Sequence, residues 1–251
     1  MIIKKTSRQI LLMKEAGRIA ANAVQLAGRA VEPGVNTLEL ETIVRKYIEA
    51  QGATGPCLGY YGYPAMSCIS VNNVVIHGIP SKKIVLKQGD IVSIDVVANK
   101  DGYCGDTTCT FACGDISVAA RRLMDTTKEC LDIGIAKAVA GNRVGDISST
   151  VQEYAEARGY SVVREYTGHG VGASMHEDPQ VPNFGTAHRG PRLEPGMTLA
   201  IEPMINQGTH RVKVLDDEWT VVTCDGKLAA HFEHTVAITS DGPVILTVPD
   251  I

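Results

Sequence analysis

Apolar residues recur at helical spacing through the first fifty residues. From Ser7 to about Val31 they repeat every three or four positions, which predicts an amphipathic helix. Pro33-Gly34 ends that helix. Thr37 is a suitable cap for a second helix that reaches Gly52. The chain therefore opens with two predicted helices and a short turn between them.

Strand patterns follow these helices. The β-branched runs at 67–80 and 90–98 are typical of strands, and the segment from Tyr103 to Phe111 is typical of another. Between the last two, the residues Asn99-Lys100-Asp101-Gly102 are a strong turn signal. We therefore expect a β-hairpin here.

The same order of elements restarts after Asp115. A long helix is predicted over about 117–140 and a shorter one over 146–158, with strands and Gly-rich turns up to the end. Only the short turn Cys113-Gly114-Asp115 separates the first series of helices and strands from the second. We therefore expect residues 1–251 to form a single domain.

The two series of elements are also similar in sequence. LKQGDIVSID at 86–95 aligns with LEPGMTLAIE at 193–202, and further matches occur in the same order. This pattern favours an internal duplication, with halves of about 1–114 and 115–251 related by a pseudo-two-fold axis.

Composition and charge exclude several classes of protein. The 251 residues are 44% hydrophobic and carry a formal net charge of −4, which is typical of a globular protein without the basic surplus of a nucleic-acid binder. No apolar run is long enough for a membrane span, and the N-terminal segment lacks the apolar core of a signal peptide. Seven scattered cysteines predict reduced thiols in a cytoplasmic protein.

The duplication aligns carboxylates. Asp95 matches Glu202, and Asp106 matches Glu233, each within or at the end of an apolar strand. A lone charge there would be buried at high cost. Carboxylates that bridge two divalent cations solve this problem, and ligation rich in oxygen suits Mn, Fe(II) or Co.

The predicted hairpin brings two of these acids together. A tight turn with Asn99 and Gly102 as its outer residues places Asp95 directly opposite Asp106, with Cβ atoms about 5 Å apart. The two carboxylates would repel each other unless one is protonated or a cation lies between them. A bulge at Gly102 would shift this register by one residue.

Histidines supply the nitrogen candidates. His169 lies between glycines, which allow the backbone to approach a bulky site closely. His77 and His176 share an H-x-x-P pattern and suit substrate contact or proton handling. We expect the other four to be ordinary surface or core residues: His188, His210, His231 and His234.

Two further motifs are weak. The spacing of Cys104, Cys109 and Cys113 puts their side chains on both faces of a strand, which favours core thiols over a zinc cluster. Gly168-x-Gly170-x-Gly172 lacks the dinucleotide-binding pattern.

Six segments carry a family resemblance: HGIP at 77–80, IDVVANKDGYCGDTT at 94–108, TGHGVG at 167–172, MHEDPQV at 175–181, IEP at 201–203 and FEHT at 232–235. Over nearly the whole chain they resemble the type I (bacterial-type) methionine aminopeptidases. The resemblance implies the α+β "pita-bread" fold, in which a central antiparallel sheet is covered by helices. It implies hydrolytic removal of the N-terminal methionine from nascent proteins and peptides, favouring a small second residue.

The resemblance also implies roles for individual residues. The metal ligands would be Asp95, Asp106, His169, Glu202 and Glu233, holding two divalent ions (Co, Mn, Fe(II) or Zn). A metal-bound hydroxide would attack the scissile carbonyl, with Glu202 handling the proton and with His77 and His176 as further catalytic residues. The substrate would be bound by Cys57, Tyr60, Tyr63, Cys68, His77, Met175, His176 and Trp219.

The expected partners are the N-termini of nascent polypeptides, and a co-translational role would also allow contact with the ribosome. We expect a monomer that binds neither nucleic acid nor membrane. Two alternatives stay open: a Xaa-Pro aminopeptidase or dipeptidase of the same fold, and a pita-bread binding module without catalysis. The latter would have lost metal ligands, whereas all five are present.

Overall fold

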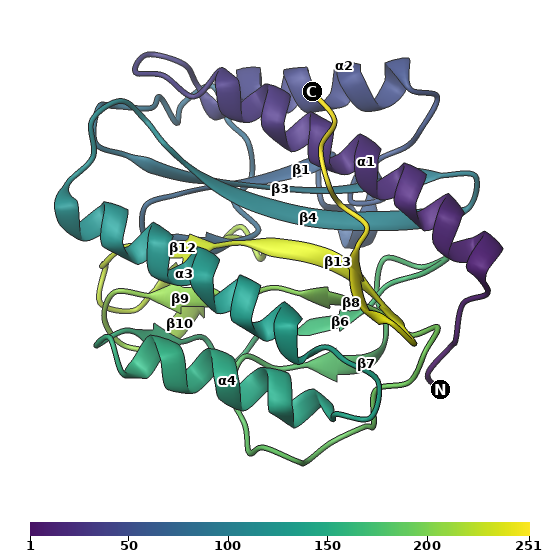
Figure 1. Ribbon diagram of the computed structural model, residues 1–251. Helices are drawn as coiled ribbons and strands as arrows, with labels where there is room; N and C mark the ends of the chain where they lie inside the picture. Colours follow the sequence, from purple (N-terminus) through teal and green to yellow (C-terminus); the bar gives the residue numbers. More distant parts are fainter.

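One antiparallel sheet forms the centre of the protein (Figure 1). The computed structural model describes residues 1–251. The strands are, in spatial order, β1 (Ser67–Val71), β3 (Ile91–Lys100), β4 (Tyr103–Ala112), β13 (Glu233–Thr239), β8 (Thr198–Ile201), β6 (Gly168–Gly170) and β7 (Glu177–Val181), with β14 (Gly242–Ile245) paired to β13. From the centre outward the order is β4, β3, β1 on one side and β13, β8, β6 on the other.

Two pairs of helices cover this sheet (Figure 1). The first pair is α1 (Ser7–Arg29) and α2 (Thr37–Ala50), and the second is α3 (Val118–Lys137) and α4 (Val144–Glu156). Helix α1 packs on β3 and β4, whereas α3 packs on β8 and β13. All four predicted helices are thus confirmed, and an apolar core lies beneath each pair.

Two helices begin earlier than predicted because of their caps. The N-cap of α2 is Asn36 rather than Thr37, and its side chain accepts a hydrogen bond from the backbone N–H of Glu39. Thr37 is instead buried, and its hydroxyl donates to the carbonyl of Ser81. Helix α4 begins two residues before the predicted start. Asp146 is the third residue of the helix, and its carboxylate accepts a hydrogen bond from the backbone N–H of the N-cap residue Arg143.

The register of the β3–β4 hairpin differs from the predicted one. Asp101 and Gly102 both have positive φ, of 51° and 80°, and form a two-residue loop. Asp95 is therefore opposite Thr108, and Asp106 is opposite Val97. The prediction that the two aspartates face each other directly was wrong. The residue opposite Asp95 is thus two positions away from the predicted one, not one position away. Both aspartates therefore stay on the same face of the sheet, as diagonal neighbours.

Two small three-stranded sheets flank the main one. The first contains β10 (Val212–Val214), β11 (Val221–Thr223) and β2 (Val74–Ile76), and the second contains β12 (Ala229–His231), β9 (Met204–Asn206) and β5 (Ser161–Val162). A single 3₁₀ turn, η1, covers Tyr60–Gly62. No helix combines the length and apolarity that crossing a bilayer requires. All seven cysteines are free.

Candidate active site

A cavity of about 620 Å³ opens beside the central strands. All thirteen side chains for which the sequence suggested a role line it: Cys57, Tyr60, Tyr63, Cys68, His77, Asp95, Asp106, His169, Met175, His176, Glu202, Trp219 and Glu233. They come from segments up to 176 residues apart in the chain, from Cys57 to Glu233. The fold therefore brings the whole predicted set to one place.

Two acids meet where the halves of the sheet join. Asp106 is on β4, and Glu233 is the first residue of β13, where it pairs with Thr108. The hydroxyl of Thr108 donates to Oε2 of Glu233 at 2.9 Å. The hydroxyl of Thr235 bonds to both the backbone N–H and the carbonyl of Asp106. These bonds fix the Glu233 carboxylate and the Asp106 backbone at the seam between β4 and β13.

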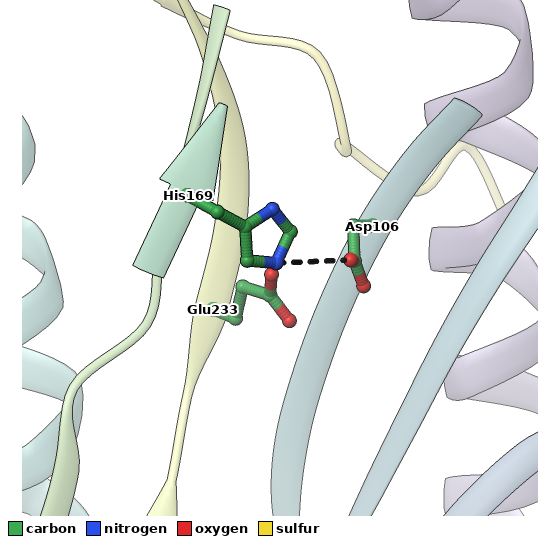
Figure 2. A group of neighbouring side chains, drawn as sticks. All are labelled: Asp106, His169 and Glu233. Carbon is green, nitrogen blue, oxygen red and sulfur yellow. Dashed lines mark ion pairs between the residues drawn. The ribbon is translucent and has the colours of Figure 1, made fainter. Parts of the chain in front are cut away.

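His169 faces this pair from β6 (Figure 2). Its Nε2 lies 3.8 Å from Oδ2 of Asp106 and 3.3 Å from Oε1 of Glu202. Its Nδ1 donates to the carbonyl of Gly170 at 2.9 Å, so in the neutral ring Nε2 carries the lone pair. Burial lowers the pKa of His169 to about 4, which keeps the ring neutral near pH 7. A neutral imidazole oriented in this way is suited to hold a metal ion.

Three of the four acids are buried, Asp95 is half-buried, and none of them has a Lys or Arg partner. Burial raises the pKa of Asp95 to about 6. Burial first, and then repulsion between the acids, raises the pKa values of the other three well above their usual range: Asp106, Glu202 and Glu233. Their only ion-pair partners within 4.0 Å are imidazoles.

One atom of this cluster lacks any partner. Oε1 of Glu233 is buried and has no hydrogen bond, although Oε2 of the same carboxylate is held by Thr108. A buried carboxylate oxygen without a donor is costly. Asp106, His169 and Glu233 can each offer one ligand atom within 4.8 Å of the others. An oxygen-rich set with one imidazole fits a divalent cation.

Two further imidazoles border the acids. The His176 ring lies 4.5 Å from that of His169 between centroids, and its Nδ1 lies 3.4 Å from the hydroxyl of Tyr60. His77 has the uncommon positive φ of 58°, and its ring packs edge-on against Tyr166. Burial lowers the pKa of His77 to about 4 and also lowers the pKa of His176. Both rings are therefore neutral hydrogen-bonding groups near pH 7.

The other wall of the cavity is soft and aromatic. Tyr63 and Trp219 pack edge to face with centroids 5.0 Å apart, and the Tyr63 hydroxyl donates to the carbonyls of Ser67 and Gly78. Burial raises the pKa values of the Cys57 and Cys68 thiols well above the usual range, so both are uncharged. Neutral thiols and aromatic rings suit an apolar, polarisable ligand group.

The alternating glycines of β6 have a packing role. A Cβ at Gly168 would lie 2.4 Å from the carbonyl oxygen of Ala200, and one at Gly170 would lie 2.2 Å from that of Asp178. Neighbouring strands therefore approach His169 closely only because its two neighbours lack side chains. This agrees with the interpretation that the motif is not a cofactor loop.

The sequence interpretation missed His231. It was expected to be an ordinary surface or core residue. It is buried, but its Nε2 has no hydrogen-bond partner and lies 3.7 Å from Oε2 of Glu202. Its position two residues before Glu233 was the available signal. The cavity is also lined by residues without a predicted role: Ile76, Val97, Tyr166, Thr167, Glu177, Asp178 and Gln180.

Comparison with known proteins gives consistent matches. Residues 11–240 match metallopeptidase family M24. A methionine aminopeptidase of Clostridium perfringens is 53% identical, covering 98% of this chain and 99% of that protein. Methionine aminopeptidase 1 of Bacillus subtilis is 50% identical, with the same coverage.

Solved structures extend these matches to three dimensions. The crystal structure of the methionine aminopeptidase from Thermotoga maritima matches with a TM-score of 0.97 and 44% identity, covering 98% of this chain and 99% of that one. The prolidase of Pyrococcus horikoshii matches with a TM-score of 0.78 at 23% identity, covering all of this chain and 65% of that one. The prolidase likeness concerns the fold alone.

Proposed function

The chain belongs to metallopeptidase family M24 and, within it, to the type I methionine aminopeptidases, and we propose that the cavity lined by the thirteen side chains is its active site. The predicted family and pita-bread fold are confirmed, and the activity is the removal of N-terminal methionine. The observation that carries the assignment of the site is a cluster of four acids, three of them buried and none with a Lys or Arg partner, beside a soft, aromatic pocket.

Five side chains would hold the metal. They would hold two divalent ions, and Asp106 and Glu233 would serve as ligands of both: Asp95, Asp106, His169, Glu202 and Glu233. The unpartnered oxygen of Glu233 supports this assignment. When bound, such ions lower the pKa of water and polarise a peptide carbonyl.

The protein's own groups perform the proton transfers and orient the substrate. Glu202, whose pKa burial raises, takes the proton of the attacking water and delivers it to the leaving nitrogen. The neutral ring of His176 donates a hydrogen bond to the substrate carbonyl oxygen as negative charge develops there. His77, which also lines the cavity, contacts the scissile amide.

The soft wall would select methionine. Cys57, Cys68 and Met175 present sulfur atoms, and Tyr63 and Trp219 present ring edges and faces. A thioether gains favourable contacts from such groups, and no charge on this wall has to be desolvated. The pocket thus fits the methionine side chain.

The substrates are the N-termini of nascent polypeptides with a small second residue, and the enzyme acts as a monomer. Contact with the ribosome would suit such a role. The seven free cysteines support a cytoplasmic location.

Replacing His176 by Ala is expected to lower kcat by about 100- to 1,000-fold while KM changes much less, because the lost hydrogen bond forms mainly in the transition state. Steady-state kinetics with a Met-Ala-x peptide measures both constants. His188→Ala, which removes an exposed imidazole that does not line the cavity, is the matched control. A His176→Ala enzyme with an unchanged kcat would exclude this role.

The function itself is tested by stripping metal with a chelator and titrating Mn, Co, Fe(II) and Zn back one at a time. We expect restored hydrolysis of Met-Ala-x peptides and none of Ala-Pro-x peptides. Preference for the proline peptide would indicate a Xaa-Pro aminopeptidase. A protein that binds peptide but turns over neither substrate with any metal would be a binding module.

A further inference from the structure

We propose that Lys5 is a positioning residue that holds His176 in its catalytic place through Glu177. Lys5 precedes the first helix and lies 171 residues before His176 in the chain. Figure 1 shows the N-terminal segment running beside the edge of the sheet that ends in β7. Glu177, the first residue of β7, directly follows His176.

The contact between Lys5 and Glu177 is buried. Nζ of Lys5 lies 2.6 Å from Oε2 of Glu177, and only 3% and 8% of the two side chains are exposed. Nζ also donates to the carbonyl of Ile3 at 3.1 Å. The backbone N–H of Lys5 donates to the carbonyl of Gly196 at 2.7 Å, which fixes the segment against the turn before β8. Lys5 is therefore anchored on both its backbone and its side chain.

The turn that presents His176 depends on this pair. The segment from Gly172 to His176 is neither helix nor strand. Oε1 of Glu177 accepts from the N–H of Ser174 at 3.4 Å, so one carboxylate joins the turn to Lys5. A Cβ at Gly172 would lie 2.2 Å from Oε1 of Glu177 and 2.6 Å from Cε of Lys5. The ion pair thus lies directly on the backbone of the turn.

No other cation is available for this carboxylate. Lys5 is the only basic group within 4.0 Å of Glu177. Without the ammonium group, a carboxylate that is almost inaccessible to water would be unpaired, and it would draw toward solvent or take up a proton. Either change moves β7 at its first residue and hence the neighbouring His176. Because misplacement by about 1 Å can cost about 100-fold in rate, the effect should be visible in kcat.

The inference rests on the proposed function, since it assumes that His176 acts on the substrate carbonyl. The test is a double-mutant cycle with Lys5→Met and His176→Ala, measured with a Met-Ala-x peptide. Lys5→Met alone is expected to lower kcat by about 10- to 100-fold with little change in KM. In the His176→Ala background it should lower kcat by less than about twofold, because Lys5 acts through that ring.

Lys4→Met is the matched control. Lys4 is adjacent in sequence and also forms an ion pair, with Glu194, but that pair is exposed at the surface. The kcat of the Lys4→Met enzyme should stay within about twofold of the wild-type value. If Lys5→Met does not fold, Lys5→Met/Glu177→Gln removes the charge together with its partner and should still lower kcat while His176 is present.

Two results would overturn the inference: an unchanged kcat in the folded Lys5 variants, or an equal loss of kcat with and without His176. The second would mean that Lys5 supports the fold generally. Failure of the proposed function is distinguishable, because wild-type enzyme would then not hydrolyse the Met-Ala-x peptide at all.

Discussion

Asp106→Asn is expected to lower turnover by about 1,000-fold or more and to remove tight metal binding. Asp106 lies at the seam of the sheet, and its charge raises the pKa values of both Glu202 and Glu233, so it interacts with the whole acidic cluster. An amide of the same size keeps the packing but supplies no charge to a cation. Calorimetric titration of the stripped variant with Mn or Co, together with kcat/KM for Met-Ala-x, measures both effects.

The same chemical change elsewhere in the hairpin provides the control. Asp101 is exposed at the tip of the β3–β4 hairpin with φ of 51°, a conformation that asparagine also adopts readily. Asp101→Asn should therefore bind metal and turn over as the wild type does. Two tight sites in Asp106→Asn would contradict the assignment of Asp106 as a shared ligand.

Metal removal is expected to produce the second large effect, a loss of stability that grows with pH. An ion at about 100 times its Kd stabilises the folded state by about 2.7 kcal/mol. For a chain of this size that corresponds to about 5–10 °C in Tm. The Tm of the chelated protein should be lower than that of the metal-loaded protein by about this amount near neutral pH.

The sign of the pH effect follows from the acids. Burial raises their pKa values in the folded state, to about 6 for Asp95 and well above the usual range for the other three. A raised carboxyl pKa contributes stability that is present below the unfolded value, near 4, and is lost as pH rises through the folded value. The metal-free protein should therefore lose stability from about pH 4 through pH 6 and above.

The loaded protein should not show this loss, because the cations balance the ionised acids. The measurement is Tm between pH 4.5 and 8 for chelated and loaded samples in the same buffers. The gap in Tm between the two samples should widen with pH. A gap that stays constant, or narrows, would mean that the acids are not the ligands.

Much of the fold and the site could be predicted from the sequence because the signals were local or repeated. The helices followed from apolar periodicity, and the acids stood out as charges within apolar strands such as IVSIDVV. The resemblance then added the methionine pocket, whose residues lie far apart in sequence. All of these side chains line one cavity. The duplication of the chain stays a prediction. The sheet supports it, because β1, β3 and β4 of the first half are arranged like β6, β8 and β13 of the second.

The errors have physical causes. The hairpin register was wrong because the loop uses Asp101 and Gly102, both of which tolerate positive φ, rather than Lys100 and Asp101. The position of His231 beside Glu202 was missed because it depends on the pairing of β12 with β9, which no local pattern encodes. The contact between Lys5 and Glu177 was missed for the same reason.

The seam between β4 and β13 has a consequence for the synthesis of the enzyme. Only two residue pairs join these strands, one of them Glu233 with Thr108, and the proposed ligands lie on both sides of the join. Because the proposed ligands come from both halves of the chain, a nascent chain cannot assemble the full metal set until the segment with Glu233 has folded onto β4. We therefore expect no turnover from a chain in which only the first half has folded.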